Sequence, residues 1–74
     1  MTILQTSIAT LATYGENEVF TLSEFWQRTD RFNCRLDYHY RYARDFLESK
    51  RIAGNVAIVG ATHFGDCVYQ KRTG

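Results

Sequence analysis

Five arginines between positions 28 and 44 are the side chains of this sequence best suited to bind a ligand. A guanidinium group can clamp a phosphate or pair with O6 and N7 of guanine. Opposed only by Asp30 and Asp37, they give this stretch a local charge of +3, although the whole chain carries only +1. Two further cations stand near the end, whereas the first 27 residues carry three glutamates and no cation. The seven cations are Arg28, Arg31, Arg35, Arg41, Arg44, Lys71 and Arg72.

Cys34, His39, His63 and Cys67 are of the types that bind zinc, but their spacing argues against a metal site. Cys34 and His39 would point about 140° apart if both were helical. Neither histidine belongs to a motif for nucleophilic catalysis. The glycines of the C-terminal third match neither a phosphate-binding loop nor a dinucleotide fingerprint. We therefore expect no metal, no cofactor and no enzymatic activity.

The composition predicts one small domain spanning residues 1–74. Hydrophobic residues make up 45% and aromatic residues 15% of the chain, enough for one modest core. No segment reaches membrane-spanning length, and residues 1–13 lack the basic start of a signal peptide. Two cysteines do not make a disulfide framework. We expect a cytoplasmic protein with no membrane partner.

Hydrophobic periodicity predicts an N-terminal amphipathic helix. Its buried stripe would consist of Leu4, Ile8, Leu11 and Ala12. Gly15 would end it, because glycine accepts the left-handed conformation of a helix end.

A second helix has the clearest start signal in the chain. The β-favouring pair at 19–20 predicts a very short strand before it. Thr21–Glu24 fits a capping box, and Phe20 and Phe25 are spaced as a hydrophobic staple. The helix is expected from Leu22 to Thr29. It would bury Leu22, Phe25 and Trp26.

A third, longer helix is expected from about Cys34 to Lys50, after a turn at Asp30–Asn33. On a helical wheel its buried stripe consists of Leu36, Tyr40, Ala43 and Leu47, widened by Phe46. The opposite, exposed face carries Tyr38, Arg41 and Asp45, flanked by Asp37 and Tyr42.

Two β-favouring runs follow and predict a hairpin. The first spans Ile52–Val59, or begins at Val56 if Gly54-Asn55 forms a turn. The second spans Cys67–Gln70, and the loop between the runs is Gly60–Asp66.

This order of elements resembles the winged helix-turn-helix superfamily. The most telling stretch is Tyr40–Ile52, in which Leu47 and Ile52 match the leucine that ends the third helix and the aliphatic residue that enters the wing. Arg51 stands where that family often has glycine. The resemblance covers almost the whole chain. It implies a small α+β winged helix: three helices followed by a two-stranded β-hairpin wing, with a short strand before the second helix.

The resemblance also implies a small transcriptional regulator that binds double-stranded DNA. In DNA-binding members the third helix enters the major groove and the wing contacts the backbone or the minor groove. Carried over by position, the groove-facing residues are Arg35, Tyr38, Arg41 and Tyr42. Further contacts would come from Arg28, Arg31, His63, Lys71 and Arg72.

Two alternatives stay open beside DNA binding. Winged helices also act as protein-interaction modules, adaptors or inhibitors of larger complexes, a role that would suit a compact phage or plasmid protein, and tyrosine and arginine suit a protein interface as well. The low net charge favours a protein partner, and the concentration of arginine favours DNA. The arginine face could also be merely solvated, with Arg41 paired to Asp37 or Asp45. A homodimer would double the number of cations facing DNA.

Overall fold

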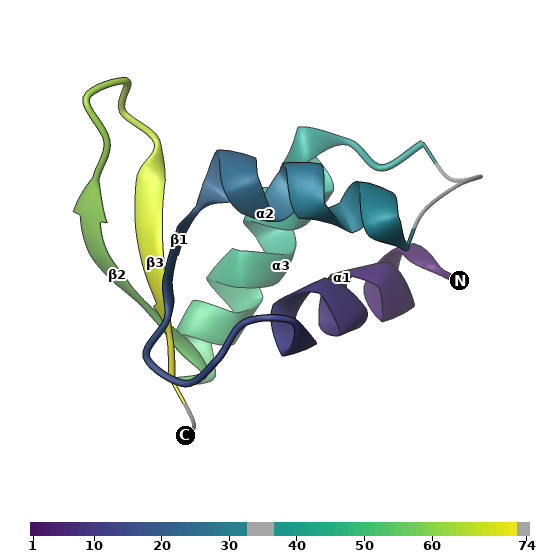
Figure 1. Cartoon of the computed structure of the whole chain (residues 1–74), viewed down its shortest axis with the longest axis horizontal. Helices are drawn as coiled ribbons and strands as arrows, with labels where there is room; N and C mark the ends of the chain where they lie inside the picture. Colours follow the sequence, from purple (N-terminus) through teal and green to yellow (C-terminus); the bar gives the residue numbers. More distant parts are fainter. Residues whose placement is uncertain (33–36, 73–74) are drawn as a thin grey trace.

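The computed structural model describes residues 1–32 and 37–72. Within them it has a small α+β fold with three helices and a three-stranded antiparallel sheet (Figure 1). None of the described helices is long and apolar enough to cross a membrane. The helices are α1 (Ile3–Ala12), α2 (Leu22–Arg28) and α3 (Tyr40–Ile52), with a 3-10 turn η1 (Thr29–Arg31) after α2. The strands are β1 (Val19–Thr21), β2 (Val56–Ala61) and β3 (Cys67–Lys71).

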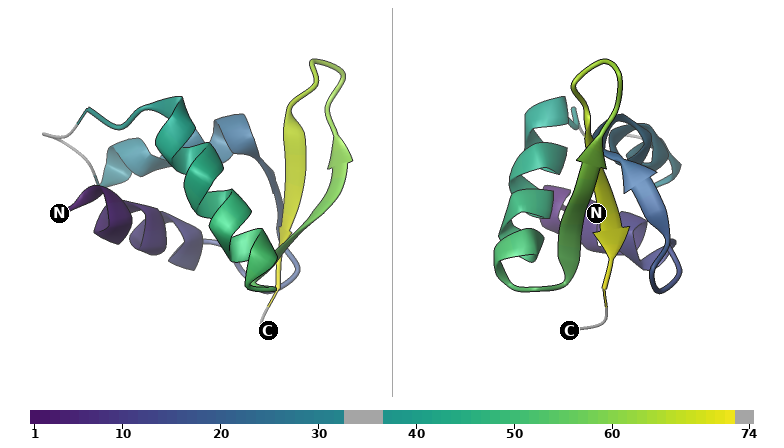
Figure 2. Two further views of the ribbon diagram at one scale, coloured as in Figure 1. Left: turned by 180° about the vertical axis from the view of Figure 1, so that it is seen from behind. Right: turned by 90° about the vertical axis from the view of Figure 1, so that its left-hand side faces the viewer.

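The short strand predicted before the second helix is confirmed, and it extends the hairpin into a sheet. The strand order is β1-β3-β2, so β3 lies in the middle. Phe20 of β1 pairs with Tyr69 of β3, which in turn pairs with Ile58 of β2. Paired residues point to the same face of a sheet. The buried Phe20 and Tyr69 therefore show that this face is turned toward the helices, while the hairpin tip projects beyond them (Figures 1 and 2).

Aromatic rings fill the core between the helices and the sheet. Phe25 is fully buried, and the ring centroids of Phe20, Phe46 and Tyr14 lie 5.9, 6.0 and 6.4 Å from its own. The sequence prediction is confirmed for the buried residues Leu22, Phe25, Ala43, Phe46 and Leu47. It is wrong for Trp26, which is 37% exposed, and whose indole N–H donates to the carbonyl of Tyr38 at 2.9 Å.

The start signal of α2 is confirmed in part. The Thr21 hydroxyl accepts the backbone N–H of Glu24 at 3.0 Å, as an N-cap should. The Glu24 carboxylate does not close the box but pairs with Arg28 one turn later at 3.1 Å. The rings of Phe20 and Phe25 are in contact, as the predicted staple requires.

The prediction of which side of α1 is buried is wrong, because the helix is rotated about its axis relative to the predicted orientation. Leu4 is 60% and Ile8 49% exposed, and Ala12 is also exposed. The buried side consists of Thr6, Ser7, Thr10 and, from the expected stripe, Leu11. The hydroxyls of Ser7 and Thr10 donate to the carbonyls of Ile3 and Thr6, four residues back, whereas the buried Thr6 hydroxyl has no hydrogen-bond partner among the described residues. Small side chains also let the neighbouring elements approach closely.

The predicted ends of α1 and α3 also differ from the observed ones. α1 ends at Ala12, and Gly15 does not adopt a left-handed conformation. α3 begins only at Tyr40, since His39 before it is extended, with φ −74° and ψ 149°. Tyr40 is 38% exposed instead of buried, and Leu36 lies outside the described residues.

The hairpin is confirmed with the later of the two predicted starts. Gly54 has a φ of +87°, which an L side chain adopts only with strain, and it turns the chain after α3. Ile52 therefore ends α3, and β2 begins at Val56.

Candidate functional site

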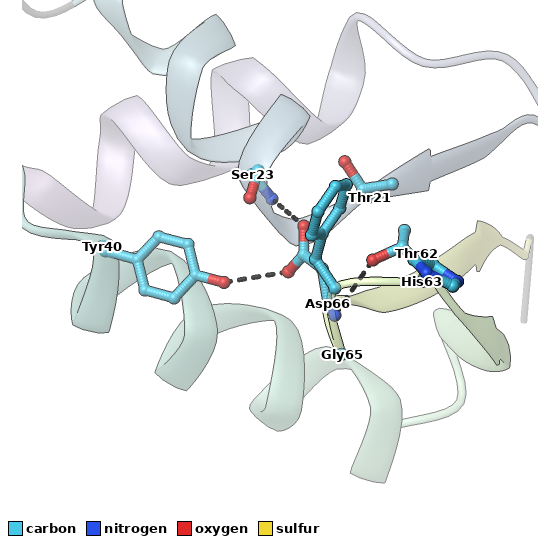
Figure 3. Close-up of a pocket in the computed structure, with 8 residues that line it drawn as sticks. Thr21, Ser23, Tyr40, Thr62, His63, Gly65 and Asp66 are labelled. Atoms are coloured by element: carbon cyan, nitrogen blue, oxygen red, sulfur yellow. Dashed lines mark hydrogen bonds between the residues drawn. The ribbon is translucent and has the colours of Figure 1, made fainter.

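The first turn of α3 lies beside the loop of the β2–β3 hairpin, and the two form an exposed surface. Tyr40 lines an open hollow of about 700 Å³ together with the loop residues Thr62–Asp66 and the start of α2 (Figure 3). We use the name α3–hairpin face for the exposed side chains in the first half of α3 and in the hairpin loop, of which His63 and Phe64 line this hollow. They are Arg41 and Arg44 of α3 and His63 and Phe64 of the loop.

Asp66 fixes the hairpin to the two helices behind it. Its carboxylate accepts the backbone N–H of Ser23 at 3.1 Å and the hydroxyl of Tyr40 at 2.9 Å (Figure 3). Burial alone would raise the pKa of Asp66, but hydrogen bonds from Ser23 and Tyr40 outweigh it, so this pKa lies below its ordinary 3.8. The pKa of Tyr40 is raised by burial and by Asp66. The orientation of the hairpin against α3 therefore depends on an ionised Asp66.

We predict that Asp66→Asn destabilises the protein at neutral pH and that the difference from the wild type shrinks in acid. A carboxylate whose pKa is lowered on folding stabilises the fold above its unfolded pKa, and this stabilisation is lost as the pH falls through the folded value. Thermal melts of both proteins between neutral pH and about pH 2.5 test this, within the range where aspartates titrate. A difference that stays constant down to the lowest pH would contradict the assigned role.

Arg41 stands out among the charged residues of α3 because it is exposed and has no ion pair within the described residues. Asp37 pairs with His39 at 3.3 Å, and Asp45 lies 3.7 Å from Arg44. Neither of the two aspartates considered from the sequence neutralises Arg41. Its guanidinium is therefore available to a ligand.

Tyr38 and Tyr42, which were predicted to be exposed beside Arg41, are buried and half-buried. Tyr38 precedes α3, is only 8% exposed and shares a short hydrogen bond with the Ser7 hydroxyl. Burial raises the pKa of its phenol. Tyr42 is half-buried, with its ring edge-on to Tyr38 and His39 at 5.9 and 5.5 Å. The prediction of a groove-facing Tyr38 is wrong, because α3 starts later than expected.

Arg28 and Lys71, expected to contact DNA, are engaged in the fold. The Arg28 guanidinium lies over the Tyr14 ring at 4.1 Å and donates to Thr13 at 3.1 Å. The Lys71 ammonium donates to the carbonyls of Tyr14 and Leu11 at 2.8 and 3.3 Å, at the end of α1. Cations stabilise helix C-termini, where carbonyls lack partners. These two side chains hold elements together and do not point to a ligand.

The remaining predicted cations do not meet on one face. Arg31 is exposed in η1, on the side of the molecule away from the hairpin (Figure 1). Arg72 is exposed just after the end of β3, whereas His63 lies in the loop before its start, and Arg72 donates to Gln70 at 3.0 Å. Arg35 lies outside the described residues. Of the predicted site residues, Arg41 lies in the first turn of α3 and His63 in the hairpin loop that lines the hollow, so these two belong to the α3–hairpin face.

Sequence reasoning missed the apolar character of the hairpin. Phe64 is 94% exposed at its tip, and Ile58 and Val59 are about half exposed on β2. A phenylalanine in a loop marked by Gly60 and Gly65 was the signal available. Asp66 carried no such signal, since its partners Ser23 and Tyr40 are distant in sequence.

The search for a metal site in the described residues and the comparisons with known proteins gave no indication of function. No three histidine, cysteine, aspartate or glutamate side chains in residues 1–32 and 37–72 are placed to hold a metal ion, while Cys34 lies outside these ranges. No protein-family model, curated protein or solved structure matches the chain.

Proposed function

We propose that this chain is a winged helix domain that binds double-stranded DNA, with α3 in the major groove and the β2–β3 hairpin as the wing. The order of helices and strands supports this, as does the position of the hairpin beside the first turn of α3. DNA-binding helices of this kind contact base edges mainly with their N-terminal residues.

The observation that carries the proposal is the unpaired, exposed Arg41 in the first turn of α3. An arginine at that position can reach guanine O6 and N7 or a phosphate without first breaking an ion pair. Arg44, one turn later, is exposed and only loosely paired with Asp45, since both side chains are more than half exposed.

The charge of the face sets the strength of binding that we expect. Between Ala53 and Gln70 the chain has no lysine or arginine, so the wing contributes little phosphate neutralisation. With roughly two or three cations in contact, the slope of log K against log salt would be about −2 to −3. Binding by one domain is therefore expected to be weak and strongly reduced at high salt.

We predict that Arg41→Ala weakens binding to a mixed-sequence duplex at low salt and reduces the salt slope by about 1, as the loss of one phosphate contact should. Arg31→Ala is the matched control, because it removes the same charge from an exposed position on another side of the molecule. Fluorescence anisotropy at several salt concentrations measures both variants. Equal losses in the two variants would refute a specific role of α3.

A protein partner is the second candidate, and the hairpin favours it. Phe64 is 94% exposed in the loop, and Ile58 and Val59 of β2 are about half exposed, so β2 and the loop present apolar side chains and no lysine or arginine. Aromatic anchors of this kind contribute strongly to protein interfaces. If the wild type fails to bind the duplex even at low salt, DNA binding is refuted and this candidate takes its place.

A further inference from the structure

The apolar side of α1 is turned outward. Leu4 and Ile8 are 60% and 49% exposed, whereas the hydroxyl residues of the helix are buried. Residues 1–13 contain no charged side chain. An uncharged helix surface with exposed aliphatic side chains indicates a contact with another apolar surface.

A groove runs beside this surface, between α1 and α3, which pack against each other on the same side of the sheet (Figure 2). It consists of two hollows that share Phe46 as a common wall. The hollow toward the start of α1 is lined by Leu4, Tyr42 and Asp45. The hollow toward its end is lined by Ile8, Lys50 and Arg72. We call both together the α1–α3 groove.

The two ends of the α1–α3 groove carry opposite charge. Asp45 lies at one end, where its only ion pair among the described residues is the loose one with Arg44 at 3.7 Å, and Lys50 and Arg72 lie at the other. The Lys50 ammonium lies 5.5 Å from the centre of the Phe46 ring, and the Lys71 ammonium is already bound to backbone carbonyls. A second groove laid against this one with the opposite direction would match each acidic end with a basic end.

We propose that the α1–α3 groove is the contact surface of a symmetric homodimer, in which the grooves of two copies meet antiparallel. In a two-fold contact one patch meets itself, so it must be self-complementary. This patch is self-complementary in shape, because it has both exposed aliphatic side chains and hollows. It is self-complementary in charge, because Asp45 of each copy meets Lys50 and Arg72 of the other. Arg41 and Phe64 do not line the groove and stay exposed in such a dimer.

The size of the groove predicts a weak dimer. α1 has 10 residues and is therefore about 15 Å long. A standard interface buries about 800 Å² per partner, which is a large share of the 4764 Å² surface of this chain. A contact along one short helix buries less, so we expect a weak and transient dimer.

Sedimentation analysis over a range of protein concentrations, without DNA, tests the dimer. The wild type should shift from 8.6 kDa toward twice that mass. Ile8→Lys, and independently Leu4→Lys, should weaken association at least ten-fold without loss of helical circular dichroism. Val59→Lys is the matched control, since Val59 is as exposed as Ile8 but lies on the hairpin. A wild type that stays monomeric, or that loses its dimer only in Val59→Lys, would overturn the proposal.

Charge reversal tests the antiparallel arrangement. Asp45→Lys and Lys50→Asp should each weaken association several-fold, and the double variant should recover most of the loss. A double variant no better than the single ones would overturn this arrangement. Arg41→Ala should leave the dimer intact, so that failure of dimer formation and failure of DNA binding are distinguished.

Discussion

Replacing Phe25 with alanine is expected to lower the free energy of unfolding by about 3–5 kcal/mol. The side chain is fully buried, and its ring packs against Tyr14, Phe20 and Phe46, which belong to three different segments. These rings are held by their own elements and cannot all move inward, so a cavity would remain. A domain of 74 residues has a total stability of about 4–11 kcal/mol. The variant therefore loses a large part of its stability.

Thermal unfolding followed by circular dichroism measures this loss. For a chain of this size, each kcal/mol shifts Tm by about 4–8 °C, so a decrease of at least about 12 °C is expected. Phe64→Ala is the matched control, because it removes the same ring from a position that is 94% exposed. Its stability should change by no more than about 0.5 kcal/mol. Similar Tm values for both variants would mean that Phe25 is not central to the core.

Replacing Lys71 with methionine is expected to cost about 1.5–3 kcal/mol of stability, the range of hydrogen bonds to a charged group. Methionine keeps most of the apolar stem and removes the ammonium that donates to the carbonyls of Leu11 and Tyr14. The Tyr14 carbonyl then loses the ammonium as its donor, while the Leu11 carbonyl keeps the backbone N–H of Tyr14 at 3.2 Å, and the side-chain link between β3 and the end of α1 is lost.

Urea denaturation measures this effect, with Arg72→Met as the control at the neighbouring exposed position. The Arg72 variant should unfold close to the wild type, because its hydrogen bond to Gln70 is at the surface. Measuring DNA affinity in the same variants distinguishes an effect on stability from an effect on binding. If Lys71→Met lowered DNA affinity at unchanged stability, the role assigned to Lys71 would be refuted.

The positions of the cations narrow the proposed DNA contact to a small area. Arg28 and Lys71 are used within the fold, and Arg31 and Arg72 lie away from the hairpin tip. Arg41, supported by Arg44, therefore carries most of the expected affinity of one chain. The proposed dimer would supply a second copy of these arginines, which is how two weak contacts give useful affinity.

The sequence by itself determined the elements whose signals are local. The cap of α2 depends on Thr21 and Glu24, three residues apart, and the turn before β2 depends on the left-handed Gly54. Both signals lie within a few residues, where backbone geometry and side-chain type suffice. The predicted positions of α2, β1 and the hairpin were accordingly accurate to within about two residues, once Val56 is taken as the start of β2.

Only the tertiary structure decided the rotation of α1 and the start of α3. Ser7 is buried against Tyr38, 31 residues away, and the carbonyl of Tyr38 accepts the indole N–H of Trp26. Both contacts are made by Tyr38, which precedes α3 although its periodicity fits the helix. A helical wheel cannot predict these contacts, because it considers only the polarity of each side chain. It does not show whether a hydroxyl can donate to a backbone carbonyl of its own helix.

The candidate site, too, could be predicted from the sequence only in part. The sequence placed arginines on the third helix, and one of them, Arg41, is exposed where the hairpin adjoins that helix. It could not distinguish Arg41 from Arg28 or Lys71, whose partners are an aromatic ring 14 residues away and carbonyls 57 and 60 residues away. The residue type of a cation does not show whether its side chain is exposed to solvent or donates to the carbonyls at the end of a helix. Only the packing of distant segments determines which of these it does.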